Sequence, residues 1–197
     1  MSRVRIPIYF DYASTLCYIT WRIVKELERE LAFDALWKGV PIAMRDLRAK
    51  PGRVLGDAER QKVLMVAAET GIKVAPPRAW IDSSAALQGA EIARDAGSFT
   101  AYHDAVFRAA FEERADIASA GVLDAIAERA GINRARFRTM LDSGAMLARI
   151  TEHKREAHRL TDRKGGLLSA CLPLPIGAEY PACSDRVGIH HLPGREP

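Results

Sequence analysis

The chain has 197 residues, of which 48% are hydrophobic and 27% charged, with a formal net charge of +4. This length suits one compact domain or a domain with an insertion, and the composition is ordinary for a globular protein. No stretch approaches the roughly 20 consecutive apolar residues of a membrane span. Because the basic residues are interleaved with acidic ones, we expect neither nucleic acid nor a membrane surface as a partner.

Residues 4–10 are mostly apolar and rich in β-branched and aromatic side chains, which predicts a buried strand. Pro7 lies inside this strand and favours an edge or a bulge, because it has no N–H to donate. Ser14 or Thr15 can cap the helix that follows by accepting a hydrogen bond from a backbone N–H two or three residues on.

Apolar residues spaced three and four apart predict that this helix runs to about residue 31. They are Leu16, Ile19, Ile23, Leu27 and Leu31. A second strand is predicted within residues 33–43, ending near Pro41. The first quarter of the chain therefore predicts a β-α-β unit.

Residues 57–161 are predicted to be helical almost throughout, with Ser, Asp or Asn at helix starts and Gly after helix ends. The expected helices cover residues 57–70, 83–97, 98–113, 119–130, 133–142 and 145–161. Two further strands are predicted over residues 167–174 and 178–181, separated by a turn.

The most informative motif lies where the first strand meets the first helix. It reads Asp11-Tyr12-Ala13-Ser14-Thr15-Leu16-Cys17-Tyr18. The N-terminal turn of a helix stabilises a thiolate through its free N–H groups and its dipole. Ser14 and Cys17 cannot form a disulfide with each other, because only one of them carries sulfur.

This motif and the order of elements resemble the cytoplasmic DsbA-like branch of the thioredoxin superfamily. That branch includes FrnE-like dithiol oxidoreductases, 2-hydroxychromene-2-carboxylate isomerases and kappa-class glutathione transferases. The resemblance extends to the helical segment around Phe99 and His103, and to the closing sequence Leu-Pro-Ile-Gly at residues 174–177.

The resemblance implies an α/β, thioredoxin-like fold with a large all-helical insertion between strand 2 and the C-terminal strand hairpin. Residues 1–44 and 162–182 would form the thioredoxin-like core. Residues 57–161 would form a helical lid, and residues 183–197 a C-terminal tail.

The motif departs from the redox pattern of the family, which is of the kind Asp-x-x-Cys-Pro-x-Cys-Tyr. Ser14 takes the place of the first cysteine, Thr15 that of the proline and Cys17 that of the second cysteine. The resemblance therefore implies an oxidoreductase-like protein without the dithiol mechanism. Glutathione-using relatives have a serine at the first position, which implies glutathione as a co-substrate whose thiolate Ser14 and the helix terminus would stabilise.

A second departure concerns the cis-proline that the family places before its late strand. In the register of residues 174–177 this position falls near Ala170 and Cys171, where no proline stands. A non-proline cis bond costs about 3 kcal/mol, so we expect Ala170 to be trans unless the register slips and Pro173 takes the role.

Each site residue also has a structural alternative. Ser14 could be only an N-cap, worth about 1 kcal/mol. Cys17 could be a small buried residue with an inert thiol, which we favour over a one-cysteine site that forms mixed disulfides. Tyr12 and Tyr18 could line a substrate pocket, although buried tyrosines are the favoured explanation. We interpret His103 as a packed interface histidine rather than a catalytic base.

The predicted site therefore has two catalytic residues, Ser14 and Cys17. Its predicted thiol- or substrate-binding residues are Tyr12, Thr15, Tyr18, Ala170 and Cys171. Cys183 and the pair at residues 190–191 lack the paired ligand spacing of a zinc site, so we expect no metal.

The three cysteines, Cys17, Cys171 and Cys183, are an odd number and lie far apart, which suits a reducing compartment and free thiols. The N-terminal segment is too short for a signal peptide. We therefore expect a cytoplasmic protein.

Three functions stay open at this point. The first is a glutathione-dependent isomerase or transferase with the helical lid over a hydrophobic co-substrate. The second is a DsbA-like thiol oxidoreductase that works through Cys17 alone. The third is a redox-inactive protein that binds a peptide or small molecule between sheet and helices. A homodimer is expected by analogy with glutathione-using relatives.

Overall fold

The computed structural model describes residues 3–41 and 50–164. Its first elements are the strand β1 (Val4–Phe10), the helix α1 (Thr15–Glu30) and the strand β2 (Phe33–Gly39). The two strands pair in parallel, with Val4 opposite Phe33 and Phe10 opposite Gly39. The predicted β-α-β unit is therefore confirmed.

Helix α1 begins where predicted, but it buries a different face from the one that its apolar spacing indicates. Ile23, Leu27 and Leu31 are 38%, 37% and 54% exposed. The buried residues of α1 are Thr15, Cys17, Tyr18, Ile19, Trp21 and Val24. The aliphatic pattern thus predicts the helix, whereas aromatic and small residues form most of its buried face.

Six helices follow in the described part of the chain. They are α2 (Asp57–Thr70), α3 (Ser84–Asp95), α4 (Phe99–Phe111), α5 (Ala120–Arg129), α6 (Arg134–Asp142) and α7 (Leu147–Lys164). Gly71, Gly97 and Gly131 have positive φ angles of 68°, 72° and 81° just after α2, α3 and α5. Glycine adopts this left-handed region without strain, which is why these residues end the helices as predicted.

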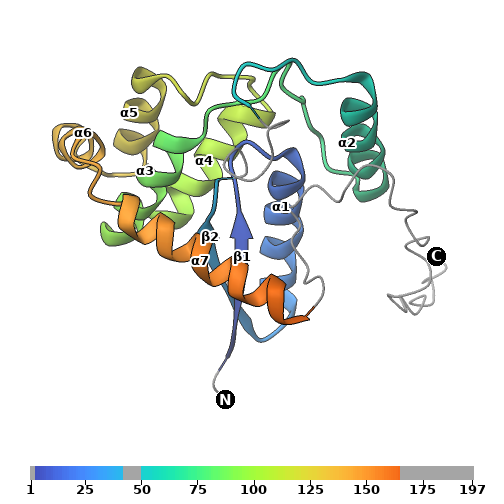
Figure 1. Cartoon of the computed structure of the whole chain (residues 1–197), viewed down its shortest axis with the longest axis horizontal. Helices are drawn as coiled ribbons and strands as arrows, with labels where there is room; N and C mark the ends of the chain where they lie inside the picture. Colours follow the sequence, from blue (N-terminus) through green and yellow to red (C-terminus); the bar gives the residue numbers. More distant parts are fainter. Residues whose placement is uncertain (1–2, 42–49, 165–197) are drawn as a thin grey trace, which may run out of the picture.

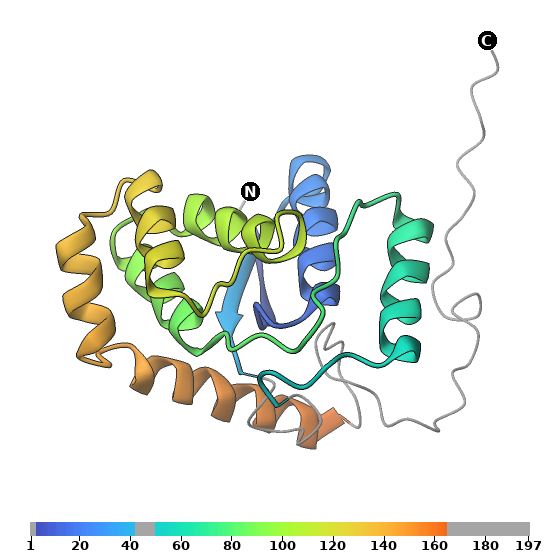
Figure 2. The same cartoon turned by 90° about the horizontal axis from the view of Figure 1, so that it is seen from above.

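The strands predicted over residues 167–174 and 178–181 lie outside the described residues, as do Ala170 and Cys171. In Figures 1 and 2 the two strands lie in the middle of the molecule, with α1 on one side and α3 and α4 on the other. Helix α7, coloured orange, runs across the strands.

Aromatic rings fill the space between the strands, α1 and α4. The ring of Phe10 on β1 lies 6.0 Å from that of Trp37 on β2 and 6.1 Å from that of Phe107 on α4. Trp21 on α1 lies 5.2 Å from Trp37 in an edge-to-face arrangement, a geometry that aromatic pairs favour. His103 lies within this cluster, 4.4 Å from Phe10 and 4.5 Å from Trp21.

Ion pairs hold α7 against β2 and α3. The ammonium of Lys38 on β2 is 2.7 Å from Oε1 of Glu156, and this hydrogen bond lowers the pKa of the Glu156 carboxyl although partial burial opposes the shift. Arg149 contacts Asp95 at 2.8 Å and the buried Glu91 at 3.4 Å. Buried carboxylates such as that of Glu91 are usually paired in this way.

Helix α2 lies on the side of α1 that faces away from α3–α6, as both views show. The segment from residue 56 to residue 77, which includes α2, is called the α2 excursion below. A short antiparallel contact joins its two ends. Gly52 N–H donates to the Trp80 carbonyl at 2.8 Å, Trp80 N–H to the Arg53 carbonyl at 2.9 Å, and Leu55 N–H to the Arg78 carbonyl at 3.0 Å. The excursion is therefore tied at its ends, whereas α2 itself buries only Ala67.

Candidate functional site

The junction between β1 and α1 is a buried turn held by its own polar groups. The carboxylate of Asp11 accepts the Ala13 N–H at 2.9 Å, and the Asp11 carbonyl accepts the Ser14 N–H at 3.1 Å. An aspartate side chain that accepts a hydrogen bond from the backbone N–H two residues later forms an Asx-turn. This turn sets the direction of the chain, and α1 starts directly after Ser14.

Of the two predicted cap residues, Ser14 is the N-cap of α1 and Thr15 is its first residue. The Oγ of Ser14 accepts the backbone N–H of Cys17 at 3.3 Å, and Ser14 is 8% exposed. Among the described residues none accepts the proton of this hydroxyl. Since the first turn of α1 contains no acidic residue, the helix dipole there favours an anion. Thr15, the first residue of α1, is also buried and is 7% exposed.

Cys17 is fully buried, and its sulfur takes part in a disulfide bond. The predicted burial of Cys17 is confirmed, and its predicted reactivity stays a prediction. The motif itself still cannot form a disulfide between its two positions.

Tyr12 is fully buried and bonded to His103 on α4. Its hydroxyl lies 2.7 Å from Nδ1 of the imidazole. Burial raises the pKa of Tyr12 well above its usual value, with smaller contributions from Tyr102 and Glu91. Burial also lowers the pKa of His103 well below its usual value, assisted by the charges of Arg94 and Lys25. Both groups are therefore neutral at physiological pH, and their burial favours the structural explanation for both.

Tyr18 is 2% exposed, and its hydroxyl reaches the far end of α4. It donates to Oε1 of Glu112 at 2.7 Å, and Arg22 lies 3.7 Å from the same oxygen. Burial is the largest cause that raises the pKa of Tyr18, followed by its hydrogen bond to Glu112 and by the charge of that carboxylate. The phenol therefore stays protonated and fixed in position.

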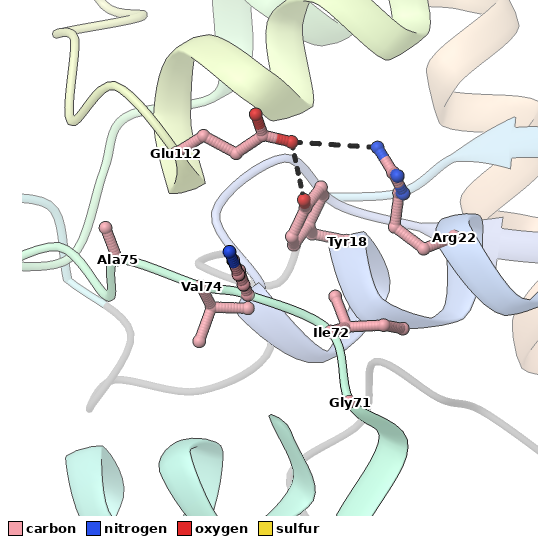
Figure 3. A pocket seen from close by; sticks show the side chains of 8 residues that line it. Tyr18, Arg22, Gly71, Ile72, Val74, Ala75 and Glu112 are labelled. Atoms are coloured by element: carbon pink, nitrogen blue, oxygen red, sulfur yellow. Dashed lines mark hydrogen bonds and ion pairs between the residues drawn. The ribbon is translucent and has the colours of Figure 1, made fainter. Parts of the chain in front are cut away.

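A pocket of about 620 Å³ lies beside Tyr18, as Figure 3 shows. It is bounded by α1, by the segment that follows α2, and by the end of α4. The lining residues are Tyr18, Arg22, Gly71, Ile72, Lys73, Val74, Ala75 and Glu112.

The sequence reasoning missed most of this pocket. Arg22 lies one turn after Tyr18 and shares its helix face, so the helix periodicity could have indicated it. Glu112 is separated from Tyr18 by 94 positions, and no local pattern connects the two. Of the predicted site residues, Ser14, Thr15, Cys17 and Tyr18 lie together in the first turns of α1. Tyr12 precedes them and is covered by α4.

The described residues contain no cis peptide bond and no group of three or more His, Cys, Asp or Glu side chains that could hold a metal ion. Of the helices that the structure describes, none is both long and apolar enough to cross a membrane.

The sequence profile of the DSBA-like thioredoxin domain matches residues 5–161 of this chain. The chain therefore belongs to the DSBA-like thioredoxin domain family, and its fold is that α/β fold with helices inserted after the second strand. A search of curated protein sequences finds no significant match.

Several solved structures have a similar fold, and their names describe different activities. A probable DsbA oxidoreductase, SCO1869 from Streptomyces coelicolor, is 21% identical, with a TM-score of 0.63 over 84% of this chain and 78% of that one. The cytosolic disulfide reductase DsbM from Pseudomonas aeruginosa, solved with GSH, is 19% identical, with a TM-score of 0.62 over 86% and 84%. A 2-hydroxychromene-2-carboxylate isomerase is 19% identical, with a TM-score of 0.62 over 79% and 80%.

Proposed function

We propose that this protein binds a small thiol, glutathione in the first instance, with the sulfur at the start of α1. The observation that carries the proposal is the Ser14 hydroxyl, which caps α1 while its own proton has no acceptor among the described residues. A thiolate placed there would accept this proton in a hydrogen bond and would face the positive end of the helix dipole. The DsbM structure solved with GSH, which has the same fold, supports the choice of glutathione.

A thiolate bound at this site supports two activities, of which the first is a glutathione-dependent isomerase or transferase and the second is thiol–disulfide exchange. In a glutathione-dependent isomerase or transferase, the thiolate adds to a hydrophobic substrate covered by the helical segment. The 2-hydroxychromene-2-carboxylate isomerase of similar fold supports this option. A cytoplasmic location is part of the same proposal, because glutathione keeps thiols reduced in the cytosol. A homodimer is proposed only by analogy with glutathione-using relatives.

The test measures binding and thiol ionisation separately. Glutathione is titrated calorimetrically into the protein, with S-methylglutathione as the ligand that lacks a thiol. The pKa of the bound thiol is followed by thiolate absorbance in the ultraviolet. We expect the bound thiol to have a lower pKa than the free one, and Ser14→Ala to remove most of this shift.

Asn133→Ala is the matched control, because Asn133 caps α6 in the same way by accepting the Arg136 N–H at 3.0 Å. Both substitutions should cost about 1 kcal/mol of stability, yet only Ser14→Ala should change the thiol pKa. Absence of glutathione binding at millimolar concentration would rule out the proposal.

The disulfide of Cys17 favours a second candidate, thiol–disulfide exchange. A glutathione thiolate would attack one sulfur of this disulfide, forming a mixed disulfide, while the other sulfur leaves as a thiolate. Turnover of a glutathione-linked disulfide by wild-type protein, abolished in Cys17→Ala, is the expected result. Equal activity of the two proteins would exclude it.

A further inference from the structure

The pocket beside Tyr18 has a wall made of unpaired backbone. Helix α2 ends at Gly71, whose N–H bonds the Ala68 carbonyl, and the chain then runs unwound past α1. Ala75 rejoins the body of the protein by donating its N–H to the Phe111 carbonyl at 2.6 Å. Between these two points, the N–H and C=O groups of residues 72–74 make no hydrogen bond with any described residue.

The side chains of this segment alternate in the manner of an edge strand. Ile72 and Val74 are partly buried and pack against the core, whereas Lys73 is exposed. Alternation of inward and outward side chains is the period of an extended strand. An edge with free N–H and C=O groups can pair with another extended chain.

The charges around the pocket favour an acidic occupant. Glu112 is already engaged by Tyr18, by Arg22 at 3.7 Å and by Arg108 at 3.4 Å. Lys73 forms no ion pair within the described part of the chain. Since Arg22 and Lys73 both line the pocket and its single carboxylate is already paired, a ligand carboxylate would find a basic side chain without a competing partner.

We propose that this pocket binds an extended peptide with an acidic side chain, which pairs with residues 72–74 as an added strand. The peptide backbone supplies the hydrogen bonds that the segment lacks, and its carboxylate contacts Lys73 and Arg22. Strand addition of this kind uses main-chain bonds for affinity and side-chain pockets for specificity. A volume of about 620 Å³ is within the range of small-ligand sites, roughly 300–1,000 Å³.

The pocket borders the proposed thiol site without depending on it. Tyr18 lies one helical turn after Ser14, on the same face of α1. A peptide in the pocket that continues toward the start of α1 would therefore approach Ser14. The occupant needs no thiol of its own, so binding of a thiol-free peptide tests this proposal alone.

The probe is the blocked peptide acetyl-Ala-Glu-Val-Glu-Ala-amide, titrated into 15N-labelled protein while amide resonances are recorded. We expect saturable shifts at Ile72, Lys73 and Val74. A peptide that is N-methylated at the central Val and one with Gln in place of both Glu residues serve as ligand controls. Each should bind about tenfold more weakly, because the first cannot pair as a strand and the second has no carboxylate.

Lys73→Gln should weaken binding of the acidic peptide about tenfold and leave binding of the Gln peptide unchanged. Lys50→Gln is the matched control, since Lys50 is also exposed and does not line the pocket. No saturable shift at about 5 mM peptide, a concentration that detects even weak sites, would overturn the proposal. Equal affinity for the N-methylated or Gln peptides would do the same. If the peptide fails while glutathione still binds, only this inference falls, and the reverse result leaves it standing.

Discussion

Helices α2 and α4 are nearly equal in length, with 14 and 13 residues, and both contact α1. Yet α4 buries seven of its residues and α2 only Ala67. The difference lies in how the two helices are built into the fold. Apolar residues of α4 gather on one face, whereas Leu64 and Met65 of α2 remain 42% and 62% exposed. Helix α4 therefore holds the start of α1 in place, whereas α2 contacts α1 with little buried surface of its own.

The hydrogen bonds of α4 explain why it fixes this region. His103 bonds Tyr12 just before α1, and Asp104 accepts the indole N–H of Trp21 at 2.9 Å within α1. The turn that positions Ser14 is therefore set from the helical segment as well as from β1. Helix α2 makes no such hydrogen bonds to α1 among those described, and the segment 71–75 that follows it forms one wall of the pocket.

The largest test of this contrast removes one apolar side chain from each helix. Phe107 is fully buried and lies 4.9 Å from the ring of Tyr12, so Phe107→Ala should cost about 3–5 kcal/mol in urea unfolding. Met65→Ala should change stability by less than about 0.5 kcal/mol. Similar losses in both variants would show that α2 is as much a part of the core as α4.

Native-state hydrogen exchange measures the same contrast without mutation. Amides in α4 should open only with global unfolding, whereas those of α2 should exchange through local opening at a free energy at least about 2 kcal/mol lower. Exchange at equal rates after correction for intrinsic chemistry would contradict the contrast.

A pair of glycines tests how tightly the helices around α4 are packed. A Cβ on Gly89 of α3 would lie 2.9 Å from the Phe137 ring and would overlap Tyr102 of α4. Gly89→Ala should therefore destabilise by about 1–3 kcal/mol. Gly121 in α5 has open space around it, so Gly121→Ala should stabilise by about 0.5–1 kcal/mol. Thermal denaturation should give opposite signs for the two; a stabilising Gly89→Ala would show that α4 has room to shift.

The last test concerns pH. Because the folded pKa of His103 lies well below its unfolded value of about 6.5, the unfolded state binds the extra proton as pH falls below that value. Stability should then be lost at up to about 1.4 kcal/mol per pH unit below pH ~6.5, and be fully present above it. His103→Phe should reduce this slope. Burial also lowers the pKa of His153, so some slope should remain. An unchanged slope in urea unfolding measured at several pH values would contradict the buried neutral imidazole.

Local sequence rules predict the elements of this fold well, because caps and helix ends depend on neighbouring residues. The cap at Ser14 and the ends at Gly71 and Gly131 were found in this way. The buried face of α1 is not determined by the local spacing through Ile23 and Leu27, because it includes aromatic residues whose partners lie on other elements.

The candidate site, too, could be predicted from the sequence only in part. Ser14 and Tyr18 follow from the motif at the helix start, whereas Glu112 reaches Tyr18 only through the packing of α4.

The antiparallel contact at the base of the α2 excursion has a consequence for how this protein can vary. Since the contact between residues 52–55 and 78–80 already holds the two ends together, the chain between them forms a closed loop. Doubling the length of such a loop costs only about 0.6 kcal/mol of closure entropy. Insertions, deletions or a whole exchange of residues 56–77 can therefore change the wall of the pocket while the turn before α1 keeps its shape. We therefore expect engineered changes of length in this loop to be tolerated.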